Sequence, residues 1–263
     1  MSRKPVAPGR RPPLRLFTTT LWEYPSQHYD SPSGEKMQGD KNYAGATPSW
    51  VIWQCLMRYT RERDLVVDPM AGSGTTLDVA RDLNRRALGY DLSPSRSDIF
   101  RADARALPLE SAKADFVFID PPYSTHITYS DDPACIGRLD AGEGDAYYSA
   151  MERVFGECHR VLKDRRYMAV YVSDSWRKRG KGDTARPRSE RATASATQGI
   201  FMPIGFRLFS MLERRFTPID IICVVRQNAK LWRGNWHKAA EEGNFFLRGF
   251  NYLLIVKKAD APA

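Results

Sequence analysis

The strongest constraint on the fold is an alternation of short apolar runs with helical patterns. Runs rich in β-branched and aromatic residues are expected to be strands, and they occupy residues 65–68, 86–91, 115–120, 167–173, 219–225 and 251–258. Segments with apolar residues at helical spacing lie among them, at 47–59, 77–84, 146–162 and 203–213. Thr47 is the expected N-cap of the first helix, before Pro48. This order predicts an α/β fold with a doubly wound, mostly parallel sheet.

The length of the chain suits one domain with one substantial core, because 42% of its 263 residues are hydrophobic. Residues 1–15 carry five basic residues and four prolines, a composition that predicts a flexible tail. Residues 16–263 are then expected to form a single domain. Long loops are expected at about 124–144, 174–199 and 227–249, and loops of this length in a compact domain are usually functional or disordered.

The charge balance favours a polyanionic partner: 40 Lys and Arg residues against 31 Asp and Glu residues give a net charge of +9. Ribosomal and membrane-surface proteins share this balance. The four cysteines form no Cys-x-x-Cys pair, which speaks against a zinc cluster or a disulfide framework, and no metal is expected. No apolar stretch reaches the length of a membrane span. We therefore expect a cytoplasmic protein with no membrane partner.

The first motif, Asp68-Pro-Met-Ala-Gly-Ser-Gly-Thr-Thr76, lies directly between an apolar strand and a helix. Gly72 and Gly74 let the backbone turn sharply and approach a ligand closely. A phosphate-binding loop would need Gly-Lys-Ser/Thr, and a dinucleotide fingerprint would need a third glycine where Leu77 stands. The carboxylate of Asp68 would repel a pyrophosphate, whereas it suits a ligand that carries an ammonium group.

Asp91 ends the next strand, about 20 residues after the glycines, where a carboxylate can accept the hydroxyls of a ribose. The pattern therefore indicates a ribose-bearing cofactor. Two alternatives remain at this point. Asp91 would also serve as the N-cap of a helix that begins near Pro94, and the glycines alone would also serve a plain tight turn.

The second motif, Asp120-Pro121-Pro122-Tyr123, ends another apolar strand, so it is expected at the same edge of the sheet as the glycine motif. The prolines make a stiff turn that presents two acceptors, the Asp120 carboxylate and the Pro121 carbonyl. Two acceptors that hold both N–H bonds of an aromatic amine localise its lone pair toward an incoming methyl group. An amine of a base within a duplex is paired, so the base must be flipped out to reach these acceptors. The Tyr123 ring is expected to stack on the flipped base. Tyr123→Phe keeps the ring and should therefore retain most activity.

The motifs DPMAGSGTT and DPPY resemble the signatures of the amino-methylating DNA methyltransferases, which methylate N6 of adenine or N4 of cytosine. The resemblance covers roughly residues 45–175. It implies a seven-stranded Rossmann-like methyltransferase fold, S-adenosylmethionine as cofactor, and site-specific methylation of DNA, as in restriction-modification. It also implies that the three long loops, at about 124–144, 174–199 and 227–249, serve target recognition and DNA contact. The cofactor residues that it and the motifs predict are Thr47, Pro48, Asp68, Pro69, Ala71, Gly72, Gly74, Thr75, Asp91 and Asp103.

Thr47 and Pro48 are implied at the methionine end of the cofactor and Asp103 at its adenine, although a loop-capping role explains Asp103 equally well. His126 is a candidate for the pocket of the flipped base, and an exposed loop histidine is the alternative. Phosphate contacts are expected from the basic segment, at Arg177, Lys178, Arg179 and Lys181. A solvated loop is the alternative there.

Several functions remain open on these residues. DPPY resembles the adenine-N6 members more often than the cytosine-N4 members, so adenine is the favoured target. An RNA methyltransferase acting on N2 of guanine would use the same chemistry. A nucleic-acid-binding module that lacks catalysis is a further alternative. The oligomeric state is undetermined.

Overall fold

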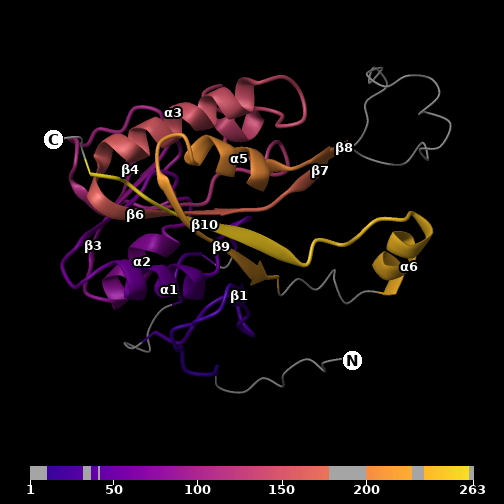
Figure 1. Cartoon of the computed structure of the whole chain (residues 1–263), viewed down its shortest axis with the longest axis horizontal. Coiled ribbons are helices and arrows are strands. Elements are labelled where there is room, and N and C mark those ends of the chain that lie inside the picture. The colour runs from indigo at the N-terminus through magenta and orange to yellow at the C-terminus, as the bar shows by residue number, and fades with distance from the viewer. Residues whose placement is uncertain (1–10, 32–36, 41, 178–199, 227–233, 261–263) are drawn as a thin grey trace.

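The computed structural model describes residues 11–31, 37–40, 42–177, 200–226 and 234–260. Its centre is one eight-stranded sheet (Figure 1). The strands follow one another across the sheet as β1 (Leu21–Trp22), β9 (Thr217–Val225), β10 (Phe250–Lys257), β6 (Leu162–Val172), β5 (Ala114–Ile119), β2 (Leu65–Asp68), β3 (Arg86–Asp91) and β4 (Ile99–Arg101). The pairings are parallel except for those of β10, which runs antiparallel to both of its neighbours. The predicted doubly wound, mostly parallel sheet is confirmed.

The expectation of seven strands was wrong. The eighth is β1, two residues long, which pairs with the edge strand β9. A pair of residues has no periodicity of its own, and its extended conformation comes from the neighbouring strand.

Helices cover both faces of the sheet (Figure 1). One face carries α3 (Ala146–Val161) and α5 (Ile204–Leu212), and the other carries α1 (Ser49–Tyr59) and α2 (Thr75–Asp82). β5 shows the packing: Val117 and Ile119 are buried in the cluster beneath α3 and α5, whereas Phe116 and Phe118 are buried in the cluster beneath α1 and α2. Side chains that alternate between two covered faces make a central strand apolar throughout. None of the helices in the described ranges is long and apolar enough to cross a bilayer.

The order of the strands creates a crevice beside the middle of the sheet. From β2 the chain continues outward to β3 and β4, and it then returns to β5 and β6 on the other side of β2. In such sheets ligands bind outside the carboxyl ends of the strands at the point where the order reverses. Here that point lies between β2 and β5. The strand ends place Asp68, Asp91 and Asp120 at one edge.

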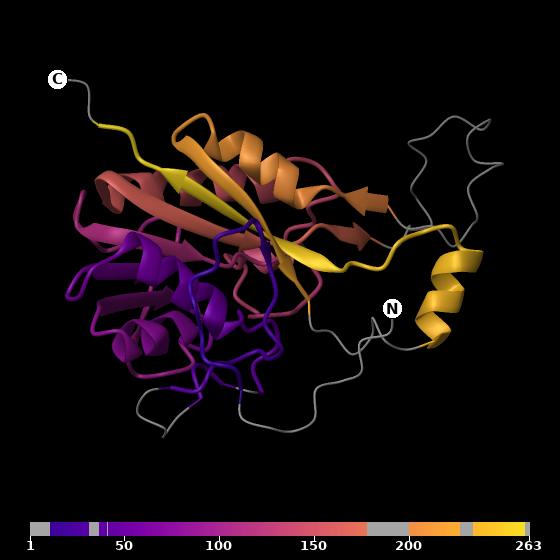
Figure 2. The same ribbon diagram turned by 60° about the horizontal axis from the view of Figure 1, so that its bottom comes forward.

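Two of the three predicted loops contain regular structure. The segment expected as a loop at 174–199 begins with β7 (Ser175–Arg177), which pairs antiparallel with β8 (Ile200–Met202). The loop expected at 227–249 contains α6 (Gly234–Glu242), which stands away from the sheet in both views (Figures 1 and 2). The loop at 124–144 holds one 3₁₀ turn, at Ile136–Arg138. Strands and turns of three residues are too short for a sequence pattern to reveal.

The last five residues of the predicted tail contact the domain. Residues 11–15 run along the domain, where the Tyr24 hydroxyl donates to the Pro12 carbonyl at 2.8 Å and the Gln54 amide donates to the Arg15 carbonyl at 2.6 Å. Leu14 packs against the core beneath α1. Residues 1–10 lie outside the described residues.

Candidate active site

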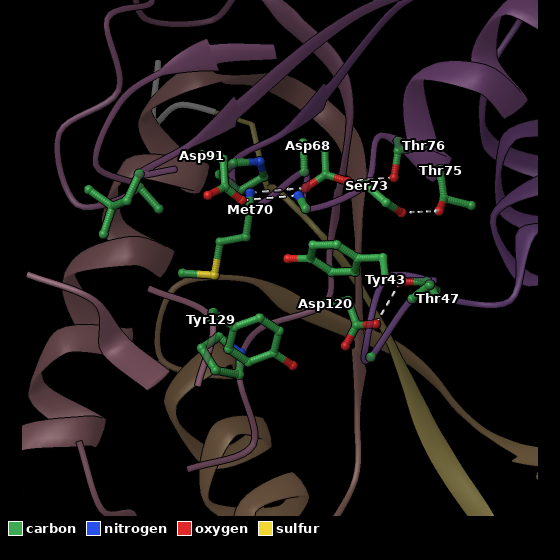
Figure 3. A pocket seen from close by; sticks show the side chains of 18 of the residues that line it. Tyr43, Thr47, Asp68, Met70, Ser73, Thr75, Thr76, Asp91, Asp120 and Tyr129 are labelled. Carbon is green, nitrogen blue, oxygen red and sulfur yellow. Dashed lines mark hydrogen bonds between the residues drawn. The ribbon is translucent and has the colours of Figure 1, made fainter. Parts of the chain in front are cut away.

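A cavity opens at the crevice between β2 and β5 (Figure 3). The space between atoms here, open solvent included, is about 840 Å³. Its lining includes nine of the residues predicted from the sequence, namely Thr47, Asp68, Pro69, Ala71, Gly72, Thr75, Asp91, Asp120 and Pro122. The two motifs, some 50 residues apart in the chain, therefore meet in one site because both follow strand ends at the same edge.

The glycine motif makes the turn from β2 into α2. Gly72 and Gly74 have φ values of 50° and 80°, in the left-handed region that favours glycine. A Cβ at Gly72 would lie 3.0 Å from the Tyr43 ring, so this backbone forms a close wall of the cavity. Gly74 is the N-cap of α2 and is absent from the cavity lining. Gly74 thus has a role in the turn, and its contact with the cofactor stays a prediction.

Asp91 is fixed at the cavity wall by two backbone amides. The Gly72 N–H donates to its Oδ2 at 3.0 Å, and the Ser93 N–H donates to its Oδ1 at 2.9 Å. Residues 92–98 contain no helix, so the alternative of a helix N-cap is wrong. A carboxylate has about four acceptor sites, and two of them on Asp91 remain for a ligand.

Asp68 is a buried carboxylate at the end of β2, with 5% of its surface exposed. The Thr76 hydroxyl donates to its Oδ2 at 2.5 Å and the Met70 N–H donates to its Oδ1 at 3.0 Å. Burial penalises the charged form and raises the pKa of Asp68 to about 7, against the opposing effect of these two hydrogen bonds. Asp68 therefore changes charge near neutral pH.

Asp120 lies across the crevice from Asp68 (Figure 3). The Thr47 Oγ1 donates to its Oδ2 at 2.6 Å, and the Tyr123 hydroxyl donates to its Oδ1 at 2.6 Å. Burial raises the pKa of Asp120 to about 7; the negative charge of Asp68 adds to the rise and the two hydroxyls oppose it. Two carboxylates that titrate near neutrality in one cavity are typical of a functional site.

Thr47 does not have the capping role that the sequence predicts. Pro48, in extended conformation, is the N-cap of α1, and no side chain caps this end of the helix. The hydroxyl of Thr47 donates to Asp120 instead. Thr47 lines the cavity and Pro48 does not, and the contact of either residue with the cofactor stays a prediction.

The Asp103 carboxylate accepts hydrogen bonds within its own loop, and its contact with the cofactor stays a prediction. Arg105 donates to it from Nε at 2.9 Å, from Nη2 at 2.6 Å and from its backbone N–H at 2.9 Å. Ala102 and Ala104 line the cavity on either side of it, but Asp103 itself does not. The structure thus supports the alternative interpretation, a carboxylate that caps its own loop.

Two tyrosines form an aromatic wall of the cavity. Tyr43 and Tyr129 both line it, with ring centroids 6.4 Å apart (Figure 3). Tyr43 belongs to no motif and was missed by the sequence analysis. Tyr123, the predicted stacking residue, packs against the core on the α3 side, and it and Pro121 are absent from the lining.

The residues predicted to contact DNA lie in different surroundings. Arg177 forms ion pairs with Asp140 at 3.4 Å and Glu143 at 3.8 Å, which argues against a phosphate contact there. His126 is exposed and contacts the hydroxyl of Ser175. Lys178, Arg179 and Lys181 lie outside the described residues.

An aromatic cluster with a cation lies on the β7–β8 hairpin. The rings of Trp176 and Phe201 are 5.3 Å apart and about two fifths exposed, at 37% and 42%. The Arg248 guanidinium lies 4.6 Å from the centre of the Phe201 ring. β7 follows the carboxyl end of β6, and Arg248 precedes the start of β10, which pairs antiparallel with β6. The cluster therefore lies at the same edge of the sheet as the cavity.

Known proteins that are similar to this chain include methyltransferases. The chain is 43% identical over 53 residues to the type II methyltransferase M.HindIII of Haemophilus influenzae, a stretch that covers 20% of this chain and 17% of that enzyme. Among solved structures, it is similar to an S-adenosylmethionine-dependent methyltransferase of Methanosarcina mazei, with 13% identity, a TM-score of 0.47, and coverage of 79% of this chain and 98% of that one.

A second similar structure is the 1,6-didemethyltoxoflavin N1-methyltransferase of Burkholderia thailandensis, with 15% identity, a TM-score of 0.48, and coverage of 83% and 80%. The family model described as DNA methylase matches residues 10–102 and 114–262, most of the chain. The match includes both motifs and the strands that carry them. The chain therefore belongs to the DNA methylase family.

Proposed function

We propose that this protein transfers a methyl group from S-adenosylmethionine to the exocyclic amino nitrogen of a base in DNA, with adenine N6 as the preferred target. The observation that carries the proposal is the position of Asp120. Its carboxylate lines the same cavity as Asp68, Gly72 and Asp91, so that an amine acceptor and a cofactor site are adjacent. Membership of the DNA methylase family supports the reaction and implies the cofactor.

The charges of the cavity fit this cofactor. Asp68, Asp91 and Asp120 line it, and none of the described lining residues is Lys, Arg or His. Such a cavity favours a cation and repels the pyrophosphate of a dinucleotide. S-adenosylmethionine carries an ammonium group and a sulfonium, and the sulfonium supplies an electrophilic methyl group. Asp91 would hold the ribose hydroxyls, and Asp68 would balance the ammonium.

The chain's part in the reaction is to hold the amine. An aromatic amine is a weak nucleophile because its lone pair is delocalised into the ring. Asp120 and the Pro121 carbonyl are the proposed acceptors of its two N–H bonds, which directs the lone pair toward the methyl group. The neighbouring Pro122 carbonyl already accepts a hydrogen bond from the Tyr147 hydroxyl at 2.8 Å. An amine in a duplex is paired, so the base has to be flipped out to reach Asp120.

Mass spectrometry of nucleosides tests this function. DNA and RNA from cells that express the wild type, or Asp120→Ala as the control, are digested and their methylated bases are compared. N6-methyladenine in DNA that depends on Asp120 is the expected result. N4-methylcytosine in DNA, or N2-methylguanine in RNA, would replace the proposed target by one of the alternatives. No methylated base in either nucleic acid, with binding of nucleic acid retained, would indicate a binding module without catalysis.

Cofactor affinity is expected to fall as the pH falls through 7. The pKa of Asp68 is about 7, and only its ionised form attracts an ammonium group. Below that pKa, binding must first remove the proton from Asp68, so the dissociation constant should rise about tenfold per pH unit. Above it, the affinity should level off.

Calorimetry with S-adenosylmethionine between about pH 6 and pH 8 measures this dependence. Asp68→Asn should bind weakly and with little change over this range, whereas Asp120→Asn, a control for the second carboxylate in the cavity, should keep the dependence. Equal affinity of the wild type at both ends of the range would contradict the pairing of Asp68 with the ammonium.

The cluster of Trp176, Phe201 and Arg248 is the proposed DNA contact beside the cavity. Stacking of a base on an exposed aromatic ring contributes roughly 1–3 kcal/mol, so Trp176→Ala should weaken DNA binding by about that amount. Arg248→Gln should lower the slope of log affinity against log salt by about one. Fluorescence anisotropy with a labelled duplex measures both. The control is Phe100→Ala, which removes a 53% exposed ring from β4; equal losses in all three variants would refute the assignment.

A further inference from the structure

We infer that the hydroxyl groups of Thr47 and Tyr123 form a clamp that orients the Asp120 carboxylate toward the target amine, which makes both of them positioning residues. The inference rests on the proposed function, since it assigns the Asp120 carboxylate to the amine. Thr47 was predicted to bind the cofactor and Tyr123 to stack on the base. The structure gives their hydroxyls a common partner.

The clamp holds both oxygens of one carboxylate. Thr47 donates to Oδ2 and Tyr123 donates to Oδ1, each at 2.6 Å, the length typical of a hydroxyl bonded to an ionised carboxylate. One such bond would leave the carboxylate free to rotate about its Cβ–Cγ bond, whereas two bonds to different oxygens fix its plane. Two of its four acceptor sites are then used, and one is left on each oxygen for a substrate.

The donors come from separate parts of the fold. Tyr123 lies three residues after Asp120, on the stiff turn that the two prolines make. Thr47 lies 73 residues before Asp120, immediately ahead of α1. The segment before α1 therefore closes over the catalytic turn. An arrangement that brings a distant hydroxyl to this carboxylate is a tertiary feature, and local chain geometry does not account for it.

The clamp also favours the charge state that the reaction needs. Burial works against the ionised carboxylate, and hydrogen bonds to it work in its favour. The other titratable groups that face Asp120 are a carboxylate and several phenols, so they provide no positive charge; they are Asp68, Tyr43, Tyr129, Tyr147 and Tyr171. Among the described lining residues, none is Lys, Arg or His. The two hydroxyls are thus the side-chain groups that stabilise the charge of Asp120.

Three variants separate positioning from the earlier assignments. Thr47→Val keeps the shape of the side chain without its hydroxyl, Thr47→Ser keeps a hydroxyl, and Tyr123→Phe keeps the ring. We expect Thr47→Val and Tyr123→Phe each to lower kcat at neutral pH about tenfold, because a hydrogen bond to a charged group is lost. The acidic limb of the pH–rate profile should move up by roughly one pH unit, since the pKa of Asp120 rises without a donor. Thr47→Ser should restore both.

The matched control is Tyr29→Phe. The Tyr29 hydroxyl donates to Asp82 at 2.7 Å, a similar tyrosine–aspartate bond, and neither residue lines the cavity. This variant should leave the pH–rate profile in place. If Thr47→Val weakens cofactor binding and leaves both kcat and the profile unchanged, Thr47 is a cofactor residue and the clamp is refuted.

A readout without turnover separates the clamp from the proposed function. Infrared difference spectra, with Asp120→Asn as the reference, follow the protonation of the Asp120 carboxyl group directly. A titration that moves to higher pH in Thr47→Val and Tyr123→Phe supports the clamp, and if the wild type methylates no nucleic acid the proposed function alone then fails. A titration that stays in place in both variants overturns the clamp, whatever the activity.

Discussion

Asp120→Ala is expected to lower the rate of methyl transfer by about two orders of magnitude or more and to leave the affinity for S-adenosylmethionine nearly intact. The reason is that the carboxylate acts on the target amine during transfer, and the loss of one such partner in a transition state has an effect of this size. The cofactor residues Asp68, Gly72 and Asp91 remain in place. Binding of the base should weaken little.

Single-turnover transfer of a labelled methyl group to DNA, combined with calorimetry of cofactor binding, measures the two effects separately. Asp120→Asn is the graded control: it keeps one acceptor oxygen but loses the charge, so its rate should fall between those of Asp120→Ala and the wild type. Loss of cofactor binding in Asp120→Ala, with an unchanged rate at saturating cofactor, would assign this carboxylate to the cofactor site instead.

Trp50→Ala is expected to lower the free energy of unfolding by about 3–5 kcal/mol, the usual result of removing a large buried aromatic side chain. Trp50 is 2% exposed on α1. It joins the helix to the segment before it through the rings of Phe17, at 6.0 Å, and Tyr24, at 5.7 Å. Because Thr47 lies three residues ahead, the same change should also loosen the approach of its hydroxyl to Asp120.

Urea denaturation followed by circular dichroism measures this stability change. Trp50→Phe should lose less, because a smaller cavity remains. Trp236→Ala is the matched control, since this tryptophan is 39% exposed on α6 and should contribute little to stability. A loss below about 1 kcal/mol in Trp50→Ala would mean that the N-terminal segment packs against the sheet without it.

The fold was predictable wherever burial imposes a period on the sequence. The strands found at 65–68, 86–91 and 114–119 are apolar because helices cover both faces, so their patterns are strong. β1, β4, β7 and β8 have two or three residues each and were missed. Their conformation depends on pairing with neighbours, and a run so short carries no period. The eighth strand was missing from the prediction for this reason, whereas the nine-residue helix at 234–242 lies within a segment that was expected to be a loop.

The site was predictable to the extent that strand ends determine it. Asp68, Asp91 and Asp120 follow apolar runs, and parallel strands bring such ends together. Tyr43 and the hydrogen bond from Thr47 to Asp120 depend on how the segment before α1 lies over the cavity. No local pattern records a contact across 73 residues. The family resemblance is confirmed by the DNA methylase match.

Two connections start at the edge of the sheet where the cavity lies, and their lengths can vary between related chains. One joins β6 to α5 and the other joins β9 to β10, and each begins and ends in elements anchored to the sheet. Changes in the length of a surface connection have a small effect on folding free energy. The strands that end at Asp68, Asp91 and Asp120 pair independently of both connections. The lengths of these two segments can therefore change while the pairing of the strands that carry the three carboxylates is kept.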